Sequence, residues 1–198
     1  MRSHTAIAFA ASAILLTACG GGSSSGNGGP GGGGGPAPTE FNALLTRGGE
    51  LSREIRQAGS SLDMPGGTAS YDGVAAFSSE RSTGTDMADA TLAARAKLDV
   101  NFNSKSLTGQ LTDFRDRDNN AIVGDVNLQG HWQTGGNHFN RVNLSGQLDL
   151  DGSDAPVTGE MSGNFRDSSG KRADLIEGYF HDLKIGDQDY VGGLVAER

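Results

Sequence analysis

The sequence predicts an all-β fold, a single antiparallel, eight-stranded, up-and-down β-barrel preceded by a signal peptide, a disordered Gly-rich linker and one or two short helices. Two observations lead to this prediction. Apolar residues alternate with polar ones over most of the second half of the chain, which is the period of a half-buried strand. Clusters of Gly, Asn, Asp and Ser separate the alternating runs at short intervals, as turns between neighbouring strands do. The predicted segments are residues 1–18, 19–38, 39–67 and 68–198.

The first 18 residues have the features of an export signal. Arg2 and His4 give a weakly basic start, and the apolar run after them is too short for a bilayer-crossing helix of ~20 residues. The next four residues resemble the lipobox of bacterial lipoproteins, which a signal peptidase recognises: Leu16, Thr17, Ala18 and Cys19. This resemblance implies that Cys19 is acylated and becomes the mature first residue. The alternatives are a cysteine that merely ends a secretory signal, or a core thiol.

The residues after the cysteine predict a tether. Residues 20–38 contain eleven Gly, three Ser and three Pro, a composition that cannot bury apolar surface. A flexible coil of these 19 residues spans about 24 Å. Cys19 is the only cysteine, so the exported domain has no disulfide and depends on packing and hydrogen bonds.

Apolar residues near helical spacing between residues 39 and 59 predict one or two short helices that pack on the mouth or side of the barrel. Thr39 is placed to cap the helix start after Pro38. Gly48 and Gly49 are expected to interrupt or kink the helix. Gly59 is expected to end it in a left-handed conformation.

Residues 68–198 contain about eight alternating runs: residues 71–77, 92–102, 107–111, 122–132, 142–150, 157–165, 175–185 and 190–195. Four of them place a glycine among the apolar residues of one face, namely Gly109, Gly130, Gly146 and Gly159. Glycine on the inside of a small barrel relieves crowding, which favours closure. A glycine-rich sandwich is one alternative. A barrel that spans the outer membrane is another, although the aromatic content of 6% is low for one.

The charge balance limits the classes of partner. The chain has 16 Lys and Arg against 24 Asp and Glu, a net charge of -8, and no basic stripe with interleaved aromatic residues. The sequence therefore has no basic surface that would neutralise phosphates and no aromatic residues beside it that would stack on bases, and we expect no nucleic-acid partner.

Two hairpins resemble the barrel domains of transferrin-binding protein B and its relatives. Residues 96–102 with 106–111 resemble the family hairpin of pattern apolar-x-Val-x-Phe, turn, x-Leu-x-Gly, and residues 176–181 with 192–196 resemble its closing hairpin. The resemblance covers residues 68–198. It implies an outer-membrane lipoprotein, on the cell surface or the periplasmic face, that binds a protein or an iron- or haem-carrying ligand.

Candidate ligand-binding residues are few. His131 and His138 flank one turn and would suit haem iron or a divalent metal, the alternative being two solvated surface histidines. The phenolates of Tyr71, Tyr179 and Tyr190 are a further candidate for iron or haem, with packing in strands as the alternative. Residues 116–120 resemble the start of a calcium loop but lack its later glycine and glutamate, so a hairpin turn is the favoured interpretation.

These patterns predict a binding protein, not an enzyme, because no histidine lies in a nucleophile motif. We expect a monomer with no required cofactor and no resident metal, with haem as a conceivable ligand. Two further functions stay open: a structural lipoprotein of the envelope without a nutrient ligand, and a lipocalin-like carrier of small molecules.

Overall fold

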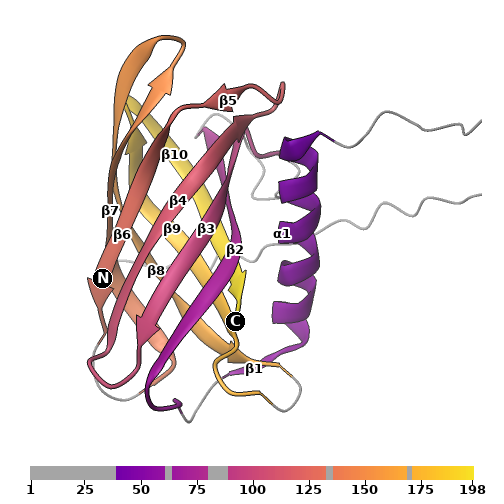
Figure 1. Cartoon of the computed structure of the whole chain (residues 1–198), viewed down its shortest axis with the longest axis vertical. Coiled ribbons are helices and arrows are strands. Elements are labelled where there is room, and N and C mark those ends of the chain that lie inside the picture. Colours follow the sequence, from indigo (N-terminus) through magenta and orange to yellow (C-terminus); the bar gives the residue numbers. More distant parts are fainter. Residues whose placement is uncertain (1–38, 61–63, 80–88, 133–135, 169–170) are drawn as a thin grey trace, which may run out of the picture.

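Eight long antiparallel strands close into a barrel in the computed structural model, which describes residues 39–60, 64–79, 89–132, 136–168 and 171–198 (Figure 1). The strands are β2 (Thr68–Ser79), β3 (Leu92–Asn101), β4 (Ser106–Asp116), β6 (Gly124–His131), β7 (His138–Leu150), β8 (Ser153–Asp167), β9 (Leu175–Ile185) and β10 (Gln188–Glu197). Each long strand pairs with the next one along the chain, and β10 pairs with β2 to close the ring. The predicted up-and-down, eight-stranded barrel is confirmed.

Two strands of two residues each extend the sheet at its ends, and the sequence patterns did not predict them. β1 (Gly59–Ser60) pairs with the end of β8. β5 (Ala121–Ile122) pairs with the end of β4.

One continuous helix, α1 (Glu40–Gln57), precedes the barrel. Thr39 is its N-cap as predicted, and its hydroxyl oxygen accepts a hydrogen bond from the backbone N–H of Asn42 at 3.3 Å. The expected break at Gly48 and Gly49 is wrong, because the helix runs through both residues. Gly48 belongs to the buried stripe of the helix, and packing of that stripe on the barrel outweighs the low helix propensity of glycine.

The end of α1 also differs from the expectation. Ala58 is the C-cap and has extended backbone angles, φ -74° and ψ 149°, and its N–H donates to the carbonyls of Glu54 and Ile55. Gly59 continues directly into β1, so the predicted left-handed glycine cap is wrong. Pairing with β8 requires an extended chain at this point, and the sequence around Gly59 alone does not reveal that partner.

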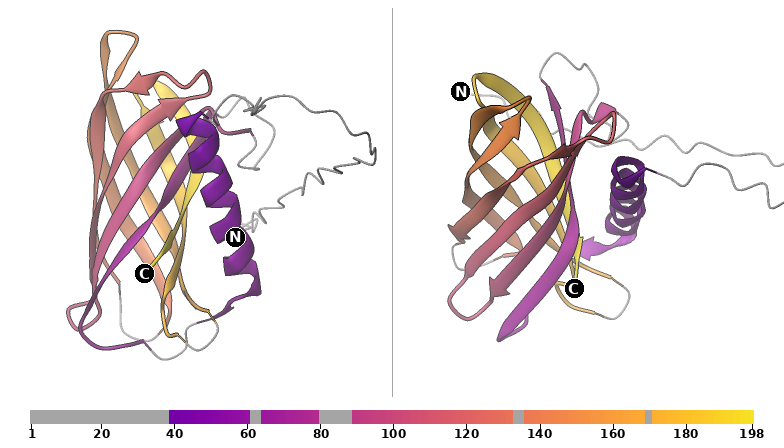
Figure 2. Two further views of the ribbon diagram at one scale, coloured as in Figure 1. Left: turned by 45° about the vertical axis from the view of Figure 1, so that its right-hand side comes forward. Right: turned by 45° about the horizontal axis from the view of Figure 1, so that its top comes forward.

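α1 lies along the side of the barrel (Figure 2). Near its start, Phe41 and Leu44 pack on the outward-facing residues Val74 and Ala76 of β2 and Ala93 of β3. Near its end, Leu51 and Ile55 pack on the outward-facing residues Leu175 of β9 and Val195 of β10. Two ion pairs join the helix to the barrel, Glu40 with Arg115 and Arg47 with Glu197. The helix therefore covers the outer wall of four strands and leaves both barrel ends uncovered.

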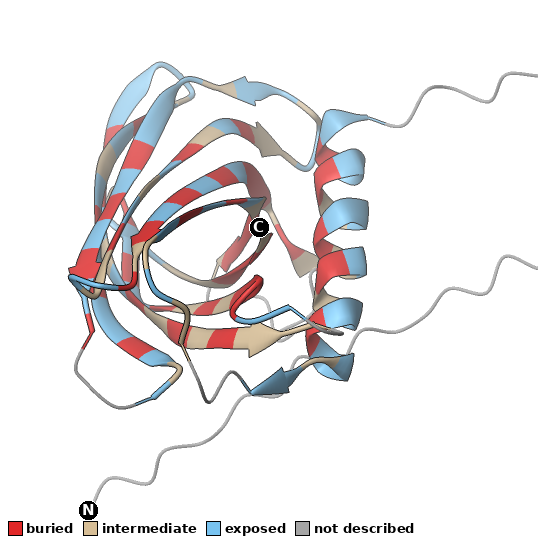
Figure 3. Cartoon of the chain, turned by 60° about the horizontal axis from the view of Figure 1, so that its bottom comes forward, coloured by how far each residue is buried: buried red, intermediate tan, exposed pale blue. Residues whose placement is uncertain are grey.

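The inside of the barrel is a packed apolar core, and the outside is mostly polar. Buried and exposed residues alternate along the strands (Figure 3). Val123 is the one large apolar side chain that is exposed among the described residues. This arrangement is the reverse of an outer-membrane barrel, which faces lipid with its apolar residues. No helix in the described part of the chain is long and apolar enough to cross a membrane.

The inward glycines fit positions where no side chain has room. A Cβ on Gly130 would lie 2.7 Å from the Cα of Val142 in β7. By contrast, a Cβ on Gly49, in the middle of α1, would meet no atom within 4 Å.

These two glycines predict opposite effects of the same substitution. Gly49→Ala is expected to raise the free energy of unfolding by about 0.5–1 kcal/mol, because alanine loses less conformational entropy in a helix. Gly130→Ala is expected to lower it by about 1–3 kcal/mol, because backbone must shift to admit the methyl group. Urea denaturation of both variants checks this, and an equal response of the two would contradict it.

Candidate functional site

The two ends of the barrel differ in how they are filled. We call the end where β2, β4, β7 and β9 begin the closed end, and the end where β3, β6, β8 and β10 begin the mouth. An aromatic plug fills the closed end around Phe165, whose ring centroid lies 5.2 Å from that of Trp132, 5.4 Å from that of Phe139 and 5.6 Å from that of Phe102. Edge-on and tilted rings at these distances pack favourably. The plug leaves little room for a ligand at this end.

Tyr71 lies beside the plug, fully buried, and its hydroxyl donates a hydrogen bond to the carbonyl of Ala173. Deeper toward the mouth, Phe77 stacks on Phe180 and on Phe114, with ring centroids 5.1 and 5.9 Å apart. The interior is thus filled from the closed end up to the layer of Phe77.

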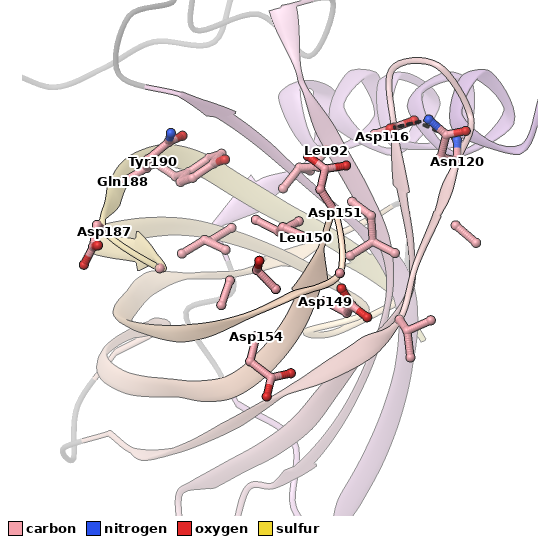
Figure 4. A pocket seen from close by; sticks show the side chains of 18 residues that line it. Leu92, Asp116, Asn120, Asp149, Leu150, Asp151, Asp154, Asp187, Gln188 and Tyr190 are labelled. Atoms are coloured by element: carbon pink, nitrogen blue, oxygen red, sulfur yellow. Dashed lines mark hydrogen bonds between the residues drawn. The ribbon is translucent and has the colours of Figure 1, made fainter.

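A hollow of about 800 Å³ opens at the mouth (Figure 4). This volume lies in the range of small-ligand and cofactor pockets, roughly 300–1,000 Å³. Three chain segments surround it: residues 116–123 between β4 and β6, residues 149–155 around the β7–β8 turn, and residues 185–190 around the β9–β10 turn. Its apolar lining consists of Leu92, Ala121, Ile122, Val123, Leu150, Ala155, Ile185 and Tyr190.

Carboxylates lie among this apolar lining. Five aspartates line the hollow, namely Asp116, Asp149, Asp151, Asp154 and Asp187, and no Lys, Arg or His does so among the described residues. Asp116 is engaged by Asn120, whose backbone N–H and side-chain amide donate to its two carboxylate oxygens at 2.7 Å. The other four are exposed, and their side-chain carboxylates have no hydrogen bond or ion pair within the described part of the chain. The hollow is therefore apolar inside and negative around it.

The contacts of Asp116 also decide between the two interpretations of residues 116–120. Besides the two bonds from Asn120, the N–H of Asn119 donates to the carbonyl of Asp116 at 3.0 Å, and Asn119 has a left-handed φ of 69°. The bond from Asn119 to Asp116 closes a β-turn over residues 116–119, and the Asp116 carboxylate holds the next residue, Asn120. The hairpin-turn interpretation is the one that the structure supports.

His131 and His138 lie at the closed end, far from the mouth, as the last residue of β6 and the first residue of β7. Both are exposed, and Nδ1 of His138 lies 3.3 Å from Oδ1 of Asn164. The described residues contain no group of three or more His, Cys, Asp or Glu that would hold a metal ion. A haem or metal role for this pair stays a prediction.

Residues 1–38 lie outside the described part of the chain, so the lipobox residues Leu16, Thr17, Ala18 and Cys19 have no structural account. Their predicted roles in signal recognition and lipidation stay predictions.

Burial raises the pKa of all three tyrosine phenols above the ordinary value of 10.0: Tyr71, Tyr179 and Tyr190. Burial is the main cause at each residue, and a hydrogen bond with Glu177 adds to the effect at Tyr179. Neutral phenols are poor iron ligands, so the structure favours the packing interpretation over the phenolate one.

The sequence patterns also missed a Ser–His pair. Oγ of Ser162 lies 2.5 Å from Nε2 of His181, across β8 and β9. A hydroxyl next to an imidazole is one requirement of nucleophilic catalysis, but a substrate pocket is another. Neither residue lines the hollow at the mouth, and His181 is exposed on the outer wall.

A closed, filled barrel with a loop-lined hollow at one end has the architecture of a β-barrel binding module. The family model for the C-lobe and N-lobe β-barrels of transferrin-binding protein B matches residues 64–198, more than half of the chain. The chain belongs to this family, which confirms the resemblance of its two hairpins. No curated protein matches the sequence significantly.

The buried phenol of Tyr71 predicts a loss of stability at high pH. Its pKa is raised in the folded protein, so its contribution is complete below the unfolded pKa of 10.0 and declines as the pH rises above that value. The free energy of unfolding should then fall by about 1.4 kcal/mol per pH unit for each tyrosine that stays protonated in the fold. Tyr71→Phe should make this fall of the free energy of unfolding shallower by about 1.4 kcal/mol per pH unit. At neutral pH the variant should be less stable by about 1 kcal/mol, because the hydrogen bond of the Tyr71 hydroxyl is lost.

Denaturant titrations between pH 8 and 12 measure this slope. Tyr190→Phe is the comparison variant: burial raises the pKa of this phenol too, but the phenol is only partly buried, so this substitution should remove a smaller part of the slope. A Tyr71→Phe variant with the slope of the unsubstituted protein would contradict the assignment.

Proposed function

We propose that this protein is a lipid-anchored outer-membrane lipoprotein whose barrel is a binding module, displayed on the cell surface, for a protein or for an iron- or haem-carrying ligand. The observation that carries the proposal is the hollow of about 800 Å³ at the mouth of an otherwise filled barrel. Rigid scaffolds commonly carry binding residues on their loops, and three turns surround this hollow. Membership of a family described by transferrin binding supports the same role.

The packed interior argues against the lipocalin-like alternative. A lipocalin holds its ligand inside the barrel, whereas this interior is occupied by Phe77, Phe114, Phe165 and their neighbours. The other alternative, a structural lipoprotein of the envelope without a ligand, gives no role to the four exposed aspartates around the hollow whose carboxylates have no partner in the described structure. Both observations favour binding at the mouth.

The location is supported by sequence features. The lipobox-like residues 16–19 supply an acylation site, and residues 20–38 supply a tether. An acyl anchor holds a polar-surfaced barrel at a bilayer without inserting it, in keeping with the polar outer wall.

Labelling with radioactive palmitate tests the anchor. We expect label on the full chain and none on Cys19→Ser, because the thiol is the predicted acylation site. Protease treatment of intact cells tests display, since a surface barrel loses its exposed loops whereas a periplasmic one is protected. Label that persists in Cys19→Ser would overturn the lipoprotein premise.

Saturable binding of a named carrier tests the ligand class. Cells that display the full chain are titrated with iron-loaded transferrin, haemoglobin and hemin, and we expect saturation by at least one of them. For hemin the readout is a shift of its Soret band. His131→Ala with His138→Ala should abolish that shift if these imidazoles hold the iron, while His181→Ala, on the outer wall, should keep it. No saturation by any of the three probes would overturn the iron-carrier proposal.

A further inference from the structure

We propose that the hollow at the mouth receives a basic protein segment, a loop rich in Lys or Arg that carries an apolar side chain at its centre. This inference rests on the proposed binding role and specifies the chemistry of the partner. It depends on three properties of the mouth: its shape, its apolar lining and its charge.

The shape and the lining determine what enters. The hollow is open to solvent and has apolar residues on several sides, including Ile122, Leu150 and Tyr190, which are only partly buried by the chain itself (Figure 4). Val123, beside them, is 72% exposed. Covering this apolar surface would contribute roughly 25 cal/mol per Å² to association. An apolar side chain of a partner is therefore the expected central contact.

The charge determines what surrounds that side chain. Asp149, Asp151, Asp154 and Asp187 present exposed carboxylates without partners in the described structure. A cluster of one sign attracts the opposite charge and speeds its association. Basic side chains on either side of the apolar contact would meet these carboxylates.

Two cations close to the mouth among the described residues are occupied elsewhere. Arg117 follows Asp116, but its guanidinium donates to the carbonyl of Ala90 through Nε and Nη2 at 3.3 and 3.1 Å. Lys184 is paired with Asp189 at 3.1 Å, and neither residue lines the hollow. Neither Arg117 nor Lys184 therefore neutralises the carboxylates that line the described part of the mouth.

A metal ion fits the mouth less well than a protein segment does. The four unpartnered carboxylates come from two different hairpins, and no three of the described His, Cys, Asp or Glu residues are close enough to ligate one ion. A small cation would also leave the apolar lining uncovered. A protein segment satisfies both the carboxylates and the apolar residues.

The experiment uses the full chain in detergent and a synthetic cyclic peptide in which a single Leu is flanked by two Lys and two Arg. Fluorescence anisotropy measures its affinity at low and high salt. Two further peptides, one with Ser for the Leu and one with Glu for the basic residues, separate the apolar from the ionic contribution. We expect the original peptide to bind most tightly and to lose affinity as salt rises.

The decisive variant is Asp151→Asn with Asp154→Asn, which removes two of the carboxylates and keeps the turn. Its matched control is Asp72→Asn with Glu54→Gln, which removes two exposed carboxylates from the outer wall and from α1. We expect the mouth variant to bind about threefold to tenfold more weakly, as two exposed ion pairs allow, and the control to bind like the unsubstituted chain. Val123→Ser should reduce the preference for Leu over Ser in the peptide.

A thermal scan separates binding from folding. Because the carboxylates repel one another in the free protein, the mouth variant should keep or slightly raise its melting temperature while it loses affinity. Equal affinity of the mouth variant and the control, or micromolar calcium alone displacing the peptide, would overturn the inference.

The carrier titrations on cells distinguish this inference from the proposed function. Carriers that bind equally well to the mouth variant and to the control would leave the binding module in place and overturn the mouth as its site. Peptide binding that depends on Asp151 and Asp154, with no carrier bound, supports the basic-segment inference and overturns the iron-carrier proposal.

Discussion

The narrow interior of an eight-stranded barrel is the constraint on which the rest of this structure depends. At this strand number the inside is just wide enough to be filled by side chains. Large residues are therefore accommodated where a glycine faces them: a Cβ on Gly163 would lie 2.6 Å from Cζ of Phe139, and one on Gly178 would lie 2.7 Å from Sδ of Met161. A Cβ on Gly163 would also lie 2.0 Å from the backbone oxygen of Glu177, so a larger residue there would displace β9, whereas at Gly178 the side chain of Met161 would have to move.

Filling the interior moves recognition to the barrel ends. At the closed end the rings around Phe165 extend the core up to the last strand residues, with Trp132 only 6% exposed. At the mouth the layer of Phe77 and Phe180 is followed by the turns, whose apolar side chains line the hollow and do not fill it, among them Leu150 and Tyr190. The same packing that removes an internal cavity therefore leaves a hollow between the turns, where apolar side chains are only partly covered and aspartates surround them.

The alternation of apolar residues predicted the long strands, because each strand buries one face in a common core, and the glycines on that face together with the short turns favoured an up-and-down closed barrel over a sandwich. Local rules failed where a distant element decides the conformation. Gly48 is helical because the barrel wall buries it, and Gly59 is extended because it pairs with Asp167.

The hollow at the mouth was not predicted, for a related reason. Asp116, Asp151 and Asp187 lie in turns far apart in sequence, and they converge only because alternate turns of an up-and-down barrel lie at one end. Asp-rich turns at alternate positions were the available signal.

The place where the chain enters the barrel links the anchor to the mouth. The N–H of Phe41 donates to Oδ1 of Asn119 at 3.0 Å, and Glu40 pairs with Arg115, so α1 begins at the mouth end. Thr39, the first described residue, therefore lies at the mouth end, and the proposed tether with its span of about 24 Å would join the barrel there. The 15 residues of β8, tilted as in small barrels, give a barrel height of roughly 40 Å. With the proposed anchor joined to the chain at the mouth end, an end-on approach of a large domain to the mouth would meet the membrane. A projecting loop needs less clearance, and this geometry agrees with the segment inferred from the charge and the apolar lining.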